Sequence, residues 1–345
     1  MVSDLPGIAP REILGGIRSQ WRYAAALPVD VEYPVSLGEG CTPLLEWRVA
    51  GLKLRCKLES INPTSSFKDR GSSVMLSVLR GQGVDTILED SSGNGGSSVA
   101  AYAAAAGMRA KILAPEHTSQ QKLIQARMHG AEVELVPGSR EATASEALRQ
   151  ANEIFYASHN WHPFFLQGTK LLAYEIWENL RFNAPDNIVM PVGAGSLVLG
   201  CYIGFSELIR AGQIERLPRL LAAQPVNCSP LAAAFRVGAR DVSSGKWTRT
   251  LAEGTSISRP VRAPETLDAI RATGGTVQTV TEAEIVDATG QLAAAGLYAE
   301  PTAAVAAAAI PHFIAQGALD PAEETVLILS GSGLKAADAM RGLAP

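Results

Sequence analysis

Short apolar segments and glycine-rich turns alternate along most of the chain. From Leu52 to Leu58 every second residue is apolar and the residues between are basic, which is the period of a half-buried β-strand. Further along, apolar runs of strand length alternate with longer segments that have helical spacing. Repeated strand–turn–helix units of this kind predict a largely parallel α/β sheet.

The same pattern gives the limits of the individual elements. Predicted strands cover residues 52–58, 86–89, 111–114, 132–136, 187–192, 220–223, 276–280 and 325–329. Predicted helices cover residues 99–106, 119–129, 141–154, 169–180, 230–237, 282–295 and 302–315, and another helix, of about fifteen residues, follows the turn at residues 193–196. We expect Pro311 to interrupt the last helix. We also expect Trp21 and Tyr23, in the irregular first forty residues, to be buried against a later element.

Four glycine- or serine-rich turns, around residues 65, 93, 195 and 331, come at the ends of predicted strands. In open α/β sheets, ligand sites lie at the carboxyl ends of the strands. The four turns are therefore candidates for one shared crevice.

Composition excludes several classes of protein. The 345 residues are 47% hydrophobic and 19% charged, which describes a globular chain of one large domain or two ordinary ones. A net charge of −4 gives no electrostatic footprint for nucleic acid or an anionic membrane. Neither a signal peptide nor a membrane-spanning run is evident, so a cytoplasmic protein is expected.

The cysteines and histidines form no metal-ligand pattern. Cys41, Cys56, Cys201 and Cys228 lie far apart without a CxxC pair, and the five histidines are scattered. We expect no metal, and reduced, buried thiols.

Lys68 is the first candidate for chemistry. The Asn62-Pro63 turn precedes it, and Ser65 or Ser66 can cap a helix that starts at about Phe67. A helix N-terminus disfavours a cation, so this position favours the neutral amine that attacks a carbonyl to form a Schiff base. For a single lysine, a solvated residue at a helix start is the alternative.

The glycine-rich turns fit some cofactors better than others. The dinucleotide fingerprint needs a glycine at position 198, where the chain has Val198, and Ala336 follows Lys335 where a phosphate P-loop needs Ser or Thr. Residues 193–196, at a predicted helix start, offer a row of N–H groups that suits a phosphate dianion. A turn for close helix–strand packing is the alternative.

A Schiff-base lysine, a phosphate cradle and an asparagine in a glycine-rich loop are the parts that hold pyridoxal phosphate. In this order, NPTSSFKDRG (62–71), SSGNGGSSVAAYAAAAG (91–107) and SGSGLK (330–335) resemble the motifs of threonine synthase, and GEGCTPLL (38–45) resembles the corresponding N-terminal segment. The similarity extends over residues 36–338. It implies the fold type II (tryptophan synthase β-family) class of pyridoxal phosphate enzymes, with two α/β domains, each an open, mostly parallel sheet flanked by helices.

The resemblance also implies roles for individual residues. Lys68 would bind the cofactor and act as the catalytic base, and Ser330 would be the hydroxyl partner of the pyridine nitrogen. The remaining implied cofactor contacts are Phe67, Asn94, Gly193, Ala194, Gly195, Ser196 and Leu197. The implied contacts to the substrate carboxylate are Ser91, Ser92, Gly93 and Gly95. For Ser330, a turn-forming serine is the alternative.

One stretch departs from the resemblance. Threonine synthases hold the phosphate of O-phosphohomoserine with a segment N-P-x-R-x-x-G-x-K, and here residues 162–170 read HPFFLQGTK. Phe165 replaces the arginine, and an unpaired phosphate dianion beside it would cost several kcal/mol. His162 and Phe165 are predicted to line the substrate pocket. His159 and His162 either take over anion binding or acid–base work or are packing residues. Arg259 or Arg262 could restore a cation.

Several activities therefore stay open. The resemblance implies conversion of O-phosphohomoserine to threonine and phosphate in amino-acid biosynthesis. A serine/threonine ammonia-lyase and a β-replacement synthase are the enzyme alternatives. A cofactor-binding protein without turnover and a dinucleotide-dependent oxidoreductase are alternatives of other classes.

The resemblance implies a domain division as well. Residues 1–69 and 151–345 would form the large, cofactor-binding domain, and residues 70–150 a small mobile domain that closes on the substrate. A homodimer is expected by family analogy.

Overall fold

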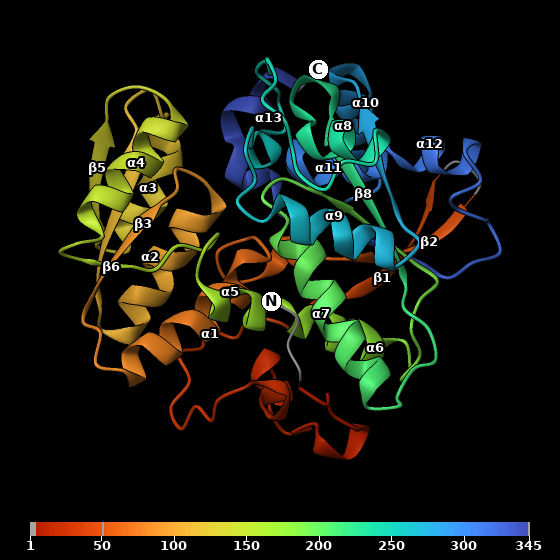
Figure 1. Cartoon of the computed structure of the whole chain (residues 1–345), viewed down its shortest axis with the longest axis horizontal. Coiled ribbons are helices and arrows are strands. Elements are labelled where there is room, and N and C mark those ends of the chain that lie inside the picture. The colour runs from red at the N-terminus through yellow and green to blue at the C-terminus, as the bar shows by residue number, and fades with distance from the viewer. Residues whose placement is uncertain (1–4, 50–51, 344–345) are drawn as a thin grey trace.

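The computed structural model describes residues 5–49 and 52–343, and these contain two β-sheets flanked by helices (Figure 1). The six-stranded sheet has the order β1-β2-β10-β7-β8-β9, and every pair in it is parallel except β1–β2. Its strands are β1 (Leu44–Val49), β2 (Leu52–Lys57), β7 (Asn187–Pro191), β8 (Arg219–Pro225), β9 (Thr276–Val280) and β10 (Thr325–Ile328). The prediction of a largely parallel α/β fold is confirmed.

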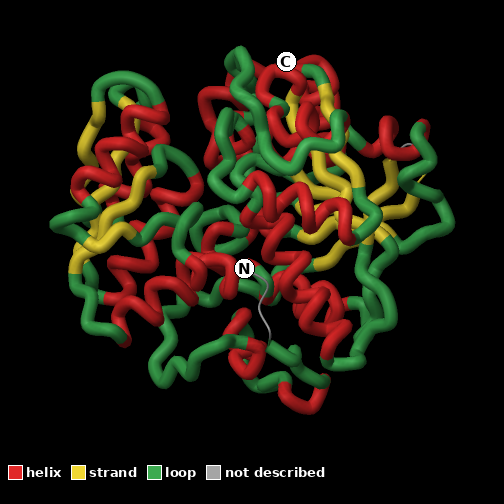
Figure 2. The backbone as a smooth tube through the Cα atoms, viewed as in Figure 1, coloured by secondary structure: helices red, strands yellow, loops and turns green. Residues whose placement is uncertain are grey.

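The four-stranded sheet is parallel throughout and has the order β5-β4-β3-β6. It consists of β3 (Thr86–Asp90), β4 (Arg109–Pro115), β5 (Glu132–Val136) and β6 (Phe155–Tyr156). The strands gather in two separate groups, one for each sheet, with helices around both (Figure 2).

Thirteen α-helices lie within the described ranges. Six of them come before β7 in the sequence: α1 (Lys68–Gly81), α2 (Asn94–Ala106), α3 (Gln120–Met128), α4 (Arg140–Gln150), α5 (Pro163–Thr169) and α6 (Leu171–Asn179). The others are α7 (Ser196–Arg210), α8 (Pro230–Arg236), α9 (Ala263–Ala272), α10 (Glu282–Ala294), α11 (Pro301–Ala308), α12 (Ile310–Ala315) and α13 (Ala337–Leu343). None of these is long and apolar enough to cross a bilayer.

Several predicted limits were wrong. Residues 94–98 belong to α2 and not to the preceding turn, and α4 ends at Gln150, four residues before the predicted end. Four elements were not predicted: β6, α5, α9 and α13. The break between α11 and α12 comes at Ala309, one residue before the second helix begins, so the expected interruption near Pro311 is confirmed. Cys41 is exposed, contrary to the prediction of four buried thiols.

The irregular N-terminal segment is fixed by its aromatic side chains, as predicted. Trp21 is 3% exposed, and its indole Nε1 donates to Ser73 Oγ of α1 at 2.9 Å. Tyr23 is buried and stacks on Tyr174 of α6. The segment thereby joins α1 to α6.

Candidate active site

Lys68 is the first residue of α1, as predicted, but the cap differs from the prediction. Neither Ser65 nor Ser66 caps the helix: Phe67 is the N-cap residue, and Ser65 has a positive φ of 68°. The turn is held instead by the Asp69 carboxylate, which accepts the Thr64 N–H at 2.6 Å. A carboxylate in the first turn is favoured by the helix dipole.

The Lys68 turn is bonded to the C-terminal loop that follows β10. The Phe67 N–H donates to the Ser330 carbonyl at 3.0 Å, and the Ser332 N–H donates to the Ser65 carbonyl at 3.0 Å. An isolated β-bridge joins Ser66 to Gly331 between these bonds. Residues more than 260 positions apart are thus fixed side by side.

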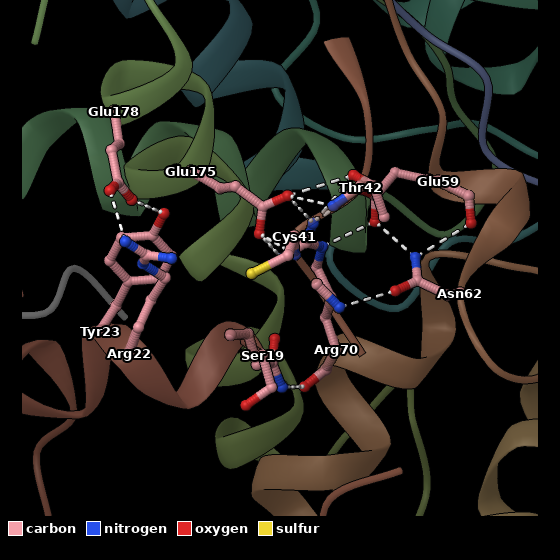
Figure 3. Close-up of polar contacts among 12 residues, drawn as sticks. Ser19, Arg22, Tyr23, Cys41, Thr42, Glu59, Asn62, Arg70, Glu175 and Glu178 are labelled. Atoms are coloured by element: carbon pink, nitrogen blue, oxygen red, sulfur yellow. Dashed lines mark hydrogen bonds and ion pairs between the residues drawn. The ribbon is translucent and has the colours of Figure 1, made fainter. Parts of the chain in front are cut away.

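A buried ionic network holds α1 two residues beyond the lysine (Figure 3). The Arg70 guanidinium contacts Glu59 at 2.6 Å and Glu175 at 3.0 Å, and Lys57 contacts Glu175 at 2.7 Å. Burial opposes the charge on Glu175, but Arg70 and Lys57 outweigh it and hold the Glu175 pKa well below its usual range. Each cation therefore has a carboxylate partner, as buried charges require.

The Lys68 amine lies against three side chains from three different segments. Its Nζ is 3.5 Å from Ser196 Oγ, 4.4 Å from the centroid of the Phe67 ring and 5.8 Å from that of Phe165. The residue keeps partial exposure, as a reactive amine must. Protein nevertheless surrounds the nitrogen, and this burial lowers the Lys68 pKa to about 8, against the charges of Glu89 and Glu300.

Ser196 begins α7, whose first turn forms a cradle of N–H groups. Gly195, the N-cap residue, has a φ of +92° and no side-chain cap. A Cβ atom there would lie 2.1 Å from Thr266 Oγ1, so the position has room for glycine only. Gly193 and Ala194 remain partly exposed. This arrangement fits a phosphate group close to the Lys68 amine.

Asn94 begins α2 and reaches the C-terminal loop from the other side. Its Nδ2 donates to Glu300 Oε1 at 2.9 Å. A Cβ atom on Gly331 would lie 2.2 Å from Glu300 Oε1 and 3.1 Å from Asn94 Nδ2. The preceding residues Ser91, Ser92 and Gly93 are partly or fully exposed. The turns around 65, 93, 195 and 331 are therefore brought together.

Ser330 supplies the observation that tests the fit to pyridoxal phosphate. Its side chain is 2% exposed, and its Oγ has no hydrogen-bond partner within the described ranges. A buried hydroxyl without a partner is costly unless a ligand satisfies it. With the Lys68 amine, the Asn94 amide and the α7 N-terminus, Ser330 completes a donor set that fits a phosphorylated pyridine aldehyde.

Phe165, on α5, closes the site where the resemblance expects an arginine. The ring is 0% exposed and packs on α1, so closely that a Cβ atom on Gly71 would lie 2.5 Å from it. On its other side it meets the His159 ring edge-on, with centroids 5.7 Å apart. The surroundings of Lys68 are thus aromatic at this point.

His162 and the two candidate arginines lie elsewhere. His162 packs against the rings of Phe155 and Phe164, and burial lowers its pKa to about 4. The Arg262 guanidinium donates to the carbonyls of Asn160 and Trp161. Arg259 lines a surface pocket with Ser139 and Trp247. Within the described ranges no contact joins these three side chains to Lys68.

Comparison with known proteins identifies the family of the chain. The family model described as "Pyridoxal-phosphate dependent enzyme" matches residues 35–331, which include the first three turns and the start of the fourth. The chain belongs to this family. Its cofactor is therefore pyridoxal 5′-phosphate.

Among its relatives in the pyridoxal-phosphate-dependent family are enzymes named threonine synthase. That of Methanocaldococcus jannaschii is 37% identical over 328 residues, covering 92% of this chain and 81% of the relative. That of Methanosarcina acetivorans is 35% identical over 325 residues, covering 92% and 80%. The resemblance to threonine synthase that the motifs indicate is thereby confirmed.

Solved structures of the family share the fold. A fungal L-serine ammonia-lyase from Rhizomucor miehei has a TM-score of 0.76 at 22% identity, over 88% of this chain and 97% of its own. Maize serine racemase has a TM-score of 0.75 at 23% identity, over 88% and 91%. These likenesses confirm the fold type II architecture.

Sequence reasoning missed two carboxylates of the site, Glu89 and Glu300. Glu89 is a charged residue inside the buried strand β3, at a position that is 0% exposed. An acidic side chain in a buried strand needs a partner, and this was the available signal. Glu300 comes just before Pro301 at the start of α11, a position typical of a helix cap, so its sequence context indicates a structural role.

Proposed function

We propose that the chain catalyses elimination or replacement at the side chain of an amino-acid substrate, with the cofactor held at Lys68. Bound pyridoxal phosphate withdraws electrons from the Cα of the amino acid. The neutral Lys68 amine, favoured by its burial, takes the Cα proton and can return it. The N–H groups and hydroxyls of residues 91–95 hold the substrate carboxylate.

Ser330 favours this reaction class over transamination. A serine hydroxyl at the ring nitrogen does not keep that nitrogen protonated, as a carboxylate would. The ring is then a weaker electron sink, and charge at Cα is relieved by losing a group from the side chain. The buried, unpartnered Ser330 Oγ supports this role.

Phe165 is the observation that favours one class of substrate over another. Its buried ring, 5.8 Å from the Lys68 amine, occupies the position where a phosphate-binding arginine is expected. A dianion against this ring would be desolvated without a partner, at a cost of several kcal/mol. We therefore favour a substrate with an uncharged leaving group, such as a β-hydroxy amino acid, and an ammonia-lyase activity.

Threonine synthesis from O-phosphohomoserine is the second candidate. The two relatives named threonine synthase above, at 37% and 35% identity, favour it. It requires that Arg262, which lies beside the 159–162 segment, reach the substrate phosphate after the small sheet moves. Residues 70–150 would be that mobile unit, and a cytoplasmic homodimer is the expected assembly.

A substrate screen separates the candidates. The loaded protein is supplied with serine, threonine, phosphoserine and O-phosphohomoserine, and release of 2-oxo acid and of phosphate is measured. We expect 2-oxo acid from serine or threonine. Phosphate and threonine from O-phosphohomoserine, without 2-oxo acid from the hydroxy amino acids, would contradict the lyase proposal and support the synthase. No product from any of the four would leave only a cofactor-binding role.

A further inference from the structure

Glu89 and His159 form a buried pair that the roles above do not use. Both Glu89 carboxylate oxygens bind the histidine: Oε1 accepts from the ring Nδ1 at 2.9 Å, and Oε2 accepts from the backbone N–H at 3.0 Å. The Glu89 side chain is 0% exposed and that of His159 9%. This doubly bonded geometry fixes both the position and the orientation of the imidazole.

The fold brings the pair together at the end of the small sheet. Glu89 lies near the carboxyl end of β3, and His159 follows the neighbouring strand β6. A further bond from the Ala157 N–H to the Leu88 carbonyl, at 2.9 Å, extends the pairing beyond β6. The carboxyl ends of parallel strands are where this class of sheet binds ligands.

The pair contacts the site at two points. A Cβ atom on Gly95 would lie 2.9 Å from both Nδ1 and Cε1 of His159, so the ring lies directly against the turn that holds the substrate carboxylate. The Phe165 ring is a neighbour of both the histidine and the lysine, with its centroid 5.7 Å from that of the His159 ring and 5.8 Å from Lys68 Nζ. The imidazole therefore lies against Gly95 of the 91–95 turn and one aromatic ring away from the Lys68 amine.

One ring nitrogen is left for a ligand. The Glu89 carboxylate accepts the proton of Nδ1, which makes Nε2 the proton donor of the charged ring and the acceptor of the neutral one. Nε2 has no hydrogen-bond partner in the described part of the chain. Nor is Nε2 one of the fully enclosed polar atoms of that part of the chain, so it remains accessible.

We propose that His159 donates a proton from Nε2 to the departing hydroxyl of a β-hydroxy amino acid, and that Glu89 is its positioning residue. The inference rests on the proposed lyase function and deepens it. Phosphate is a good leaving group and needs no such proton, whereas hydroxide is a poor one. A site that has lost its phosphate-binding arginine and gained a general acid is consistent with such a substrate.

The step balances as loss of water. Lys68 takes the Cα proton, and the electrons of that C–H bond form the Cα–Cβ double bond. The Cβ–O bond breaks, its electron pair leaves with the oxygen, and the oxygen takes the Nε2 proton to depart as water. Lys68 releases the Cα proton to solvent and solvent returns one to His159, so both groups are restored. Hydrolysis of the released enamine consumes one water to give the 2-oxo acid and ammonia.

Leaving-group dependence tests this role. Wild type, His159→Asn and Glu89→Gln are assayed as loaded enzymes with L-serine, which needs the proton, and with β-chloro-L-alanine, which loses chloride without one. We expect His159→Asn to lower kcat with serine about 100-fold or more, and to lower it less than about 5-fold with chloroalanine. Glu89→Gln keeps the shape of the side chain. It should lower the serine rate about 10-fold more than the chloroalanine rate, because its effect on the Lys68 pKa is common to both substrates.

Two controls isolate the chemistry from the fold. His312 bonds Glu284 in a comparable pair between α10 and α12, away from the site, so His312→Asn should leave both rates unchanged. The visible absorbance of each loaded variant, and its change on adding unreactive L-alanine, should match wild type. Should His159→Asn fail to retain the cofactor, Glu89→Gln carries the comparison.

The outcomes distinguish the two hypotheses. A selective loss with serine supports the general acid. Equal losses with both substrates, or no loss with serine, would overturn the role of His159. In that case turnover of serine by the wild type would still support the proposed lyase function. A wild type that is inactive with both substrates would overturn the proposed function, and this inference with it.

Discussion

The protonation of Lys68 can be measured directly in the cofactor-free protein. Burial lowers its pKa from the ordinary 10.5 to about 8, so at pH 8 about half of the amine is neutral. An ordinary lysine is less than about 1% neutral at that pH. We expect Lys68 to react about a hundredfold faster than a solvated lysine at pH 8, with a midpoint near pH 8.

Competitive labelling with trace acetic anhydride gives this midpoint, because the reagent is small, uncharged and reacts only with neutral amines. Acetylation of the Lys68 peptide is followed by mass spectrometry from pH 6 to about 11, with Nα-acetyl-lysine amide as the reference amine. A midpoint near 10.5 would show that the amine is solvated and would refute the argument from burial.

The same shift has a consequence for stability with a definite sign. The folded-state pKa of Lys68 lies below the unfolded value, so between about pH 8 and 10.5 the unfolded chain binds more protons and stability rises with pH. The full difference corresponds to about 3 kcal/mol, and partial exposure of the side chain reduces it. Urea unfolding of the cofactor-free wild type and of Lys68→Met should converge with rising pH. Parallel pH profiles would contradict the linkage.

Three further substitutions test other parts of the site. Lys68→Ala should abolish the visible absorbance of the bound cofactor, and absorbance that survives dialysis would exclude Lys68 as the attachment point. Gly195→Ala places a Cβ atom 2.1 Å from Thr266 Oγ1 at a φ of +92°. We therefore expect cofactor affinity, measured by equilibrium titration, to fall about tenfold or more. An unchanged affinity would contradict the role of this turn as a phosphate cradle. Arg70→Met removes the cation that pairs with both Glu59 and Glu175. We expect the free energy of unfolding, measured with urea, to fall by about 3–5 kcal/mol. A fall of less than about 1 kcal/mol would show that the network adds little to stability.

The sequence predicted most strands and helices because their signals are local. The alternating pattern of β2, the apolar run of β7 and the glycine after α2 each follow from neighbouring residues. The four turns could be assigned to one crevice because a topological rule places the carboxyl ends of parallel strands together. Lys68 could be singled out because the turn before it predicts a helix start.

The details that the sequence did not show depend on contacts between distant residues. Asp69, and not a serine, fixes the Lys68 turn because the Thr64 N–H comes within reach only after the chain reverses. The Glu89–His159 pair joins residues 70 positions apart through the pairing of β3 with the two-residue strand β6. A strand so short carries no periodic signal, so neither partner could be assigned from the pattern alone.

The arrangement of buried charge around α1 explains how one helix can be both rigid and reactive. Arg70 and Lys57 are positive and Glu59 and Glu175 are negative, so these four groups anchor the helix with no net charge. Because they compensate one another, the Lys68 pKa is left to the burial of its own nitrogen, with Glu89 and Glu300 acting against it. Removing the charge of Glu89 or Glu300 should therefore lower the Lys68 pKa further. Replacing Arg70 with an uncharged residue instead leaves a net negative charge among the four groups, close to the start of α1.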